Sequence, residues 1–244
     1  HGVSYDKPLR RTREYVEIVR QILARQQTLR YDGYHYQLPL SGANTTGAGK
    51  PLKSVAHTNP EQGIYLASIT PGGLRVAAEI ADGVILSFID PEDTAEIVDR
   101  HLAEGFARES AKCSRSTFTV STMVRVIVAD DASAVFEAIK PSMARQLGGM
   151  GSRQKNFYAE FAKRMGYEDE VEQIQTLYLS GEKEKASRVV PESLIDRTCL
   201  IGPPERIRQR LSAWRDAERR GSLDLMLVTT EQPEAVTLLA EELL

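Results

Sequence analysis

The sequence is poor in the features that mark disulfide-rich and membrane proteins. Only two cysteines occur in 244 residues, Cys113 and Cys199, and they lie far apart without the spacing of metal ligands. Two isolated cysteines favour reduced thiols, and we therefore expect a cytoplasmic protein. No apolar run approaches the roughly 20 residues that cross a bilayer, so the sequence predicts no membrane partner.

A strong charge of either sign is also lacking. The 31 lysines and arginines are interspersed among 34 acidic residues, which gives a net charge of −3. This balance argues against a nucleic-acid-binding face. The four histidines have no partners at metal-ligand spacing, so no metal site is expected.

What the sequence does contain is enough apolar surface for one α/β domain. Hydrophobic residues make up 41% of the chain, and a chain of this length has the size of one barrel or one open α/β domain. We expect a single domain over residues 1–244.

The most informative segment is residues 64–88, which read as strand, turn, helix, turn and strand. A short apolar run at 64–67 leads into turn residues at 68–73, and Leu74, Ala77, Ala78 and Ala81 then repeat at helical spacing. Asp82 and Gly83 end the helix before a second apolar run at 84–87. Two strands joined by one helix predict a parallel pair. The turn leaves the first N–H groups of the helix available to an anion, for which a cofactor phosphate is the natural candidate.

The remaining elements follow the same α/β pattern, with few exceptions. A helix at 9–25 precedes a small hairpin at 29–38 and a glycine-rich loop at 41–49. Asp90 and Pro91 are a candidate N-cap and first residue for a helix at 91–112. Beyond it we expect a strand at 117–129, two or three helices over 131–189, a short apolar run at 198–201, a helix opened by Pro203 and Pro204, a strand at 223–229 and a final helix. Four strong strands joined by helices are half of the number in a (β/α)8 barrel.

Several motifs, in the correct order, resemble the bacterial luciferase-like superfamily, and most closely its branch of oxidoreductases that use coenzyme F420, a deazaflavin. They are KPLRRTREYVEIVRQIL at 7–23, YDGYHY at 31–36, ASITP at 67–71 with ADG at 81–83, and IGPPERIRQRL at 201–211. The resemblance implies a TIM barrel of luciferase-like type that lacks its N-terminal strands, so that the chain supplies the fifth to eighth strands. Four strands alone leave two edges unpaired. We therefore expect a fragment of a longer chain, the alternative being a domain completed by shorter strands.

The resemblance also implies a cofactor site. In the family, the turn after the fifth strand holds the cofactor phosphate, which corresponds here to Ser68, Ile69, Thr70, Gly72 and Gly73. The end of the sixth strand, Ser87 and Phe88, lines the pocket near the ring. The alternatives are that the turn only caps a helix and that Phe88 belongs to the core. No catalytic acid or base is assigned, because such groups belong to the missing strands.

For the activity, the resemblance implies hydride transfer between coenzyme F420 and a small organic substrate, by a protein that is commonly a homodimer. Three alternatives remain open. The first is an FMN-dependent monooxygenase supplied by a separate reductase. The second is a flavin-binding or degenerate barrel without turnover, and the third is an α/β protein that binds a sugar phosphate at residues 70–73.

Overall fold

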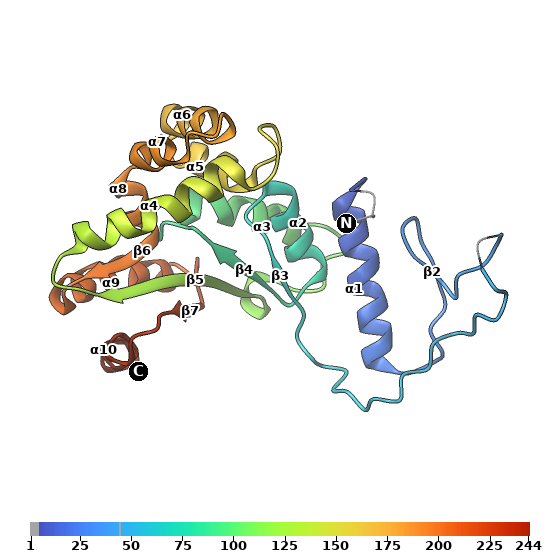
Figure 1. Ribbon diagram of the computed structural model, residues 1–244. Coiled ribbons are helices and arrows are strands. Elements are labelled where there is room, and N and C mark those ends of the chain that lie inside the picture. Colours follow the sequence, from blue (N-terminus) through green and yellow to red (C-terminus); the bar gives the residue numbers. More distant parts are fainter. Residues whose placement is uncertain (1–4, 44) are drawn as a thin grey trace.

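The computed structural model describes residues 5–43 and 45–244, which form a parallel sheet flanked by helices (Figure 1). The elements of the N-terminal part are α1 Pro8–Ala24, β1 Tyr31–Asp32, β2 Gln37–Leu38, β3 Tyr65–Ala67, α2 Pro71–Ile80, β4 Gly83–Ser87, the π-helix η1 Ala95–Asp99 and α3 Arg100–Phe106. Those that follow are the 3-10 helix η2 Arg115–Thr117, β5 Thr119–Val128, α4 Ala132–Gly149, α5 Phe157–Arg164, α6 Glu168–Leu179, α7 Lys183–Val189, α8 Glu192–Thr198, β6 Cys199–Gly202, α9 Pro204–Arg219, β7 Leu225–Thr229 and α10 Pro233–Leu243.

The strand–helix–strand unit predicted at residues 64–88 is confirmed as β3, α2 and β4. The two strands are parallel, with Leu66 opposite Val84. The Asp82 carboxylate, which follows α2 in the chain, accepts the Ile64 N–H at 2.7 Å and an Arg20 N–H at 3.0 Å. This carboxylate therefore holds the end of α2 beside the start of β3.

The long strand β5 is the centre of the sheet. It pairs in parallel with β4 over its first half, with β7 from Ser121 to Arg125, and with β6 from Arg125 to Val128. The four predicted core strands are therefore present as β3, β4, β5 and β7. The apolar run at 198–201 forms a further short strand, β6, whose four residues are all buried.

One face of this sheet is covered and the other is open. Val120, Val124 and Val126 of β5 are fully buried, whereas Met123 between them is 49% exposed and Arg125 is also exposed. This alternation places Met123 and Arg125 on the open face. Within residues 5–43 and 45–244 the sheet does not close, because β3 pairs only with β4, and β7 only with β5.

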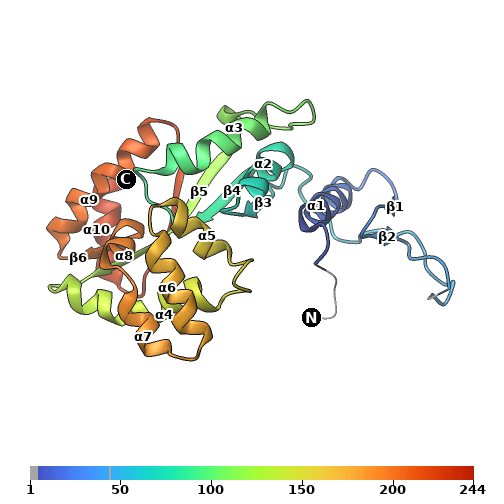
Figure 2. The ribbon, with the colours of Figure 1, turned by 90° about the horizontal axis from the view of Figure 1, so that it is seen from above.

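The N-terminal helix and hairpin extend from one side of the molecule, beside α2 (Figures 1 and 2). The predicted hairpin is confirmed, since β1 and β2 are antiparallel. Buried Glu14 of α1 holds it by accepting the backbone N–H groups of Tyr34, His35 and Tyr36 at 2.9, 2.7 and 3.2 Å. Val16 packs on α2 beside Val76 and Ile80, so α1 is fixed against the turn region.

Two expectations about helices were wrong. The helix predicted at 91–112 begins only after a turn at 91–93 and ends at Phe106, because the segment beyond it turns back to donate the Lys112 N–H to the Glu79 carbonyl. The segment 131–189 contains four helices instead of two or three. Gly151, Gly166 and Gly181 have positive φ angles at its three breaks, a backbone conformation that ends a helix.

Candidate functional site

A cavity of about 680 Å³ opens where β3 ends and α2 begins. Six of the seven predicted site residues line it: Ser68, Ile69, Thr70, Gly72, Gly73 and Ser87. Pro8, Leu9 and Thr12 of the N-terminal helix form another wall. Sequence reasoning missed this contribution, because it depends on the packing of α1 against α2.

Two hydroxyl groups organise the turn at residues 68–73. The Thr70 Oγ1 accepts the Gly73 N–H at 3.1 Å and so caps α2. The Ser68 Oγ accepts the Thr70 N–H at 3.3 Å and lies 3.4 Å from the Thr70 hydroxyl. The capping role considered for this turn is therefore real, and it leaves the two hydroxyls side by side.

The two glycines of the turn keep this space open. A Cβ at Gly73 would lie 2.0 Å from the Ser68 Oγ and 2.8 Å from the Thr70 Oγ1, and a Cβ at Gly72 would lie 2.8 Å from Leu9 Cδ1. Pro71 has no N–H, and within the described chain no hydrogen bond is found for the Gly72 N–H. One free amide and two adjacent hydroxyls at a helix N-terminus fit a phosphate group.

A cation lies against the same turn. Arg164, at the end of α5, donates from Nη2 to the Ile69 carbonyl at 3.0 Å. Its Nη1 is buried and has no partner among the residues that the structure describes. Burial lowers the pKa of Arg164, an effect that an anion nearby would oppose. No local sequence signal links Arg164 to a turn 95 residues earlier.

A second cavity of about 250 Å³ adjoins the first, and Ser87 and Tyr158 line both. Phe88 lines only the second cavity. Its ring packs edge-on against Tyr158 and Phe161, with centroid distances of 6.3 and 6.5 Å. The backbone of Phe88 has a φ of 64°, which is strained for an aromatic residue. Ser87 thus lies where the two cavities meet, and Phe88 forms part of a wall.

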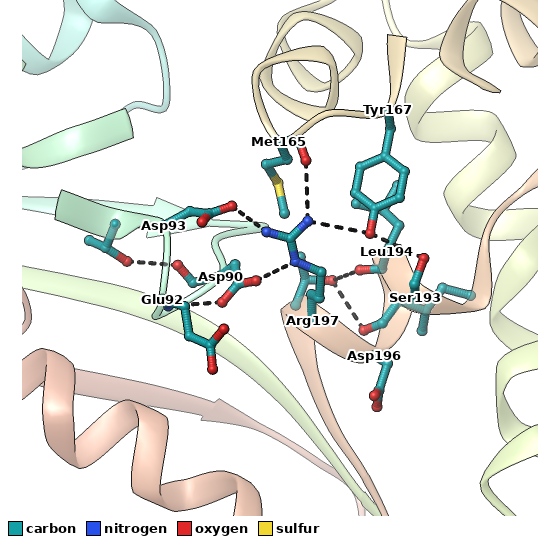
Figure 3. Close-up of polar contacts among 12 residues, drawn as sticks. Asp90, Glu92, Asp93, Met165, Tyr167, Ser193, Leu194, Asp196 and Arg197 are labelled. Atoms are coloured by element: carbon teal, nitrogen blue, oxygen red, sulfur yellow. Dashed lines mark hydrogen bonds and ion pairs between the residues drawn. The ribbon is translucent and has the colours of Figure 1, made fainter. Parts of the chain in front are cut away.

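The segment after Phe88 is held by a partly buried ion-pair network (Figure 3). Arg197 of α8 bonds the carboxylates of Asp90 and Asp93, and its Nη1 donates to the Met165 carbonyl at 3.2 Å. Burial lowers the pKa of Arg197, but the contacts with Tyr167 and the two aspartates raise it by more. The pKa of Arg197 is therefore above its ordinary value. Asp90 also accepts the Glu92 N–H at 2.9 Å. The network joins the carboxyl end of β4 to the helices that follow β5.

A second buried carboxylate fixes the wall formed by α1. Glu79 of α2 bonds Arg13 of α1, and it accepts from Arg108 at 2.6 Å and from Ser110 at 2.5 Å. Despite burial, these contacts, with that of Arg13 the largest, lower the pKa of Glu79 to about 2. Its carboxylate therefore stays ionised and ties α1 to the rest of the fold.

Comparison with known proteins identifies the family. The model of the family described as luciferase-like monooxygenase matches residues 1–220. The chain belongs to the luciferase-like monooxygenase family. The named family and the four parallel strands at the predicted places confirm the resemblance read from the motifs.

Two curated relatives bear names that refer to specific activities. One, from Mycobacterium tuberculosis, is Rv3520c, whose name assigns it to the coenzyme F420-dependent oxidoreductases; it is 38% identical over 98% of this chain and 68% of its own length. The other is a 5,10-methylenetetrahydromethanopterin reductase from Archaeoglobus fulgidus, 24% identical over 86% of this chain and 58% of its own length. The chain thus spans between 58% and 68% of the length of these relatives.

Solved structures of the luciferase-like type share the fold. A coenzyme F420-dependent tetrahydromethanopterin reductase from Methanopyrus kandleri matches with a TM-score of 0.68 and 21% identity, over 96% of this chain and 62% of that one. An F420-dependent secondary alcohol dehydrogenase matches with a TM-score of 0.66 and 14% identity, over 100% and 63%. These matches confirm the predicted fold class, a luciferase-like barrel, and this chain covers 62% and 63% of the two structures.

Proposed function

We propose that the protein is an oxidoreductase that transfers a hydride between coenzyme F420 and a small organic substrate. The observation that carries the proposal is the first cavity, whose floor is a helix N-terminus with two adjacent hydroxyls and a free amide. The relatives named above for coenzyme F420 support the choice of cofactor. In this proposal, the protein is a single-domain cytoplasmic homodimer.

The residues of this chain have defined tasks in the proposed reaction. The hydroxyls of Ser68 and Thr70 and the Gly72 N–H hold the cofactor phosphate, and Arg164 adds positive charge beside them. Gly73 keeps the cradle open, and Ser87 borders the space shared with the substrate. Coenzyme F420 supplies a carbon centre that accepts or donates a hydride. Phe88 and Tyr158, which pack together, form the wall that separates water from this space.

Fluorescence titration with coenzyme F420 and with FMN tests the proposal. The protein is the full gene product, and the variants are Ser68→Ala and Thr70→Val. We expect coenzyme F420 to bind, and each variant to bind it about tenfold more weakly, since each loses one hydrogen bond to a charged group. Thr12→Val is a matched control, because Thr12 lines the same cavity but donates its hydroxyl to the Pro8 carbonyl.

The other functions considered make different predictions in the same titration. Binding of FMN alone would favour a monooxygenase that takes reduced flavin from a separate reductase, a function that the name of the family also supports. Coenzyme binding without turnover would indicate a degenerate barrel. Binding of a sugar phosphate but neither coenzyme would refute the proposed oxidoreductase.

A further inference from the structure

Arg125 is a cation in the second cavity that the proposed cofactor site does not use. It lies on β5, opposite Cys199 of β6 and Thr229 of β7, and these three residues line the cavity together. Because side chains alternate along a strand, Arg125 shares the open face of the sheet with Met123. In a barrel of this type, that face is directed towards the interior.

Arg125 has no acidic partner in the described chain. Neither a hydrogen bond nor an ion pair of its guanidinium is found among residues 5–43 and 45–244. The Oδ2 atom of Asp196 pairs with Arg206 and Arg210 at 2.8 and 3.0 Å, and Asp196 does not line the cavity. No acidic side chain lines either cavity in this part of the protein. A cation without a counter-charge at a ligand cavity favours an anionic ligand.

The rest of the lining indicates what that ligand carries. Gln146 of α4 and Thr229 bring polar side chains to the same lining, while Phe88 and Met143 provide apolar surface. Ser142 also lines the cavity, but its hydroxyl already donates to the Ile139 carbonyl at 2.8 Å. A single guanidinium forms two parallel hydrogen bonds to a planar carboxylate. The small volume and single positive charge suit one monoanionic carboxylate attached to a hydrocarbon group better than a phosphate dianion.

We propose that the second cavity binds a carboxylate group of the substrate, with Arg125 as its anchor. This inference rests on the proposed function, because it makes the second cavity the substrate side of the cofactor site. Ser87 and Tyr158 line both cavities, so a molecule held at Arg125 extends towards the first. The substrate class is therefore a small carboxylic acid whose reacting carbon lies near Ser87.

The test compares benzoate with benzamide as probes, by isothermal titration calorimetry on the full gene product. The variants are Arg125→Gln, which removes the charge, and Arg125→Lys, which keeps it but loses the planar fork. Arg145→Gln is the matched control, because Arg145 is an exposed arginine on α4 outside the cavity lining. Arg125 is exposed and has no bonded partner in the described chain, and a thermal melt of each variant checks that the fold is retained.

We expect benzoate to bind the wild type and Arg145→Gln equally, and Arg125→Gln about 10- to 100-fold more weakly, with Arg125→Lys between them. Benzamide should not distinguish the variants. Equal benzoate affinity in wild type and Arg125→Gln, or no binding to the wild type, would overturn the inference. A parallel titration with coenzyme F420 separates the two proposals. If Arg125→Gln weakens the binding of coenzyme F420 but not of benzoate, Arg125 serves the cofactor and the inference is wrong. If benzoate binding depends on Arg125 but coenzyme F420 does not bind, only the cofactor assignment is refuted.

Discussion

Replacement of Glu79 by glutamine should destabilise the protein in a pH-dependent way. The carboxylate has its pKa lowered from 4.5 to about 2 by Arg13, Ser110 and Arg108, and the side chain is only 7% exposed. The difference between these pKa values corresponds to about 3 kcal/mol of stability at neutral pH, at about 1.4 kcal/mol for each pKa unit. Glu79→Gln should therefore lower the free energy of unfolding by about 3 kcal/mol at pH 7.

The direction of the pH effect follows from the lowered pKa. The stabilisation is complete above the ordinary value of 4.5 and disappears as the pH falls through the folded value of about 2. The difference between wild type and Glu79→Gln should thus shrink to about half at pH 3, as measured by urea denaturation at several pH values. Glu104→Gln is the control, since Glu104 is an exposed partner of Arg75 and its loss should have little effect. A constant difference between pH 7 and pH 3 would refute the electrostatic reasoning.

Three further changes test the packing around the site. Gly73→Ala should weaken coenzyme F420 binding at least tenfold, because its Cβ would meet the Ser68 Oγ; unchanged affinity in a fluorescence titration would show that this cradle is not used. Thr70→Val should also cost about 1 kcal/mol of stability through the lost helix cap, and a thermal melt identical to the wild type would contradict this. Arg197→Met should lower the free energy of unfolding by about 3 kcal/mol, since it leaves Asp90 buried without its cation. Chemical denaturation measures this difference, and replacement of Arg219, which pairs with Asp216 at the surface, is the control.

The local part of the fold could be predicted from the sequence. The β3–α2–β4 unit follows from a short apolar run, a turn of small residues and alanines at helical spacing, all within 25 residues. The turn residues Ser68, Thr70 and Gly73 could be singled out for the same reason. Contacts of this kind join residues that are close in the sequence, so the local sequence pattern predicts them.

What could not be predicted depends on distant contacts. The helix expected at 91–112 is shortened because Asp90 bonds Arg197, more than 100 residues later, and because Lys112 reaches back to Glu79. The positions of Arg164 at the turn and of Arg125 in the second cavity depend on which strands and helices become neighbours. Local pattern fixes the type of an element, whereas its ends and the partners of its charged side chains are decided by tertiary packing.

Three other strands pair with β5, and this shared pairing limits how the protein can change in evolution. Its pairing with three other strands sets the relative heights of Ser87, Arg125 and Thr229. Loss of one residue from its middle would turn the side chains beyond that point to the opposite face. Insertions and deletions should therefore be poorly tolerated within β5, while the five helices between β5 and β6 can vary in length, and new substrate preferences should arise from that variable segment.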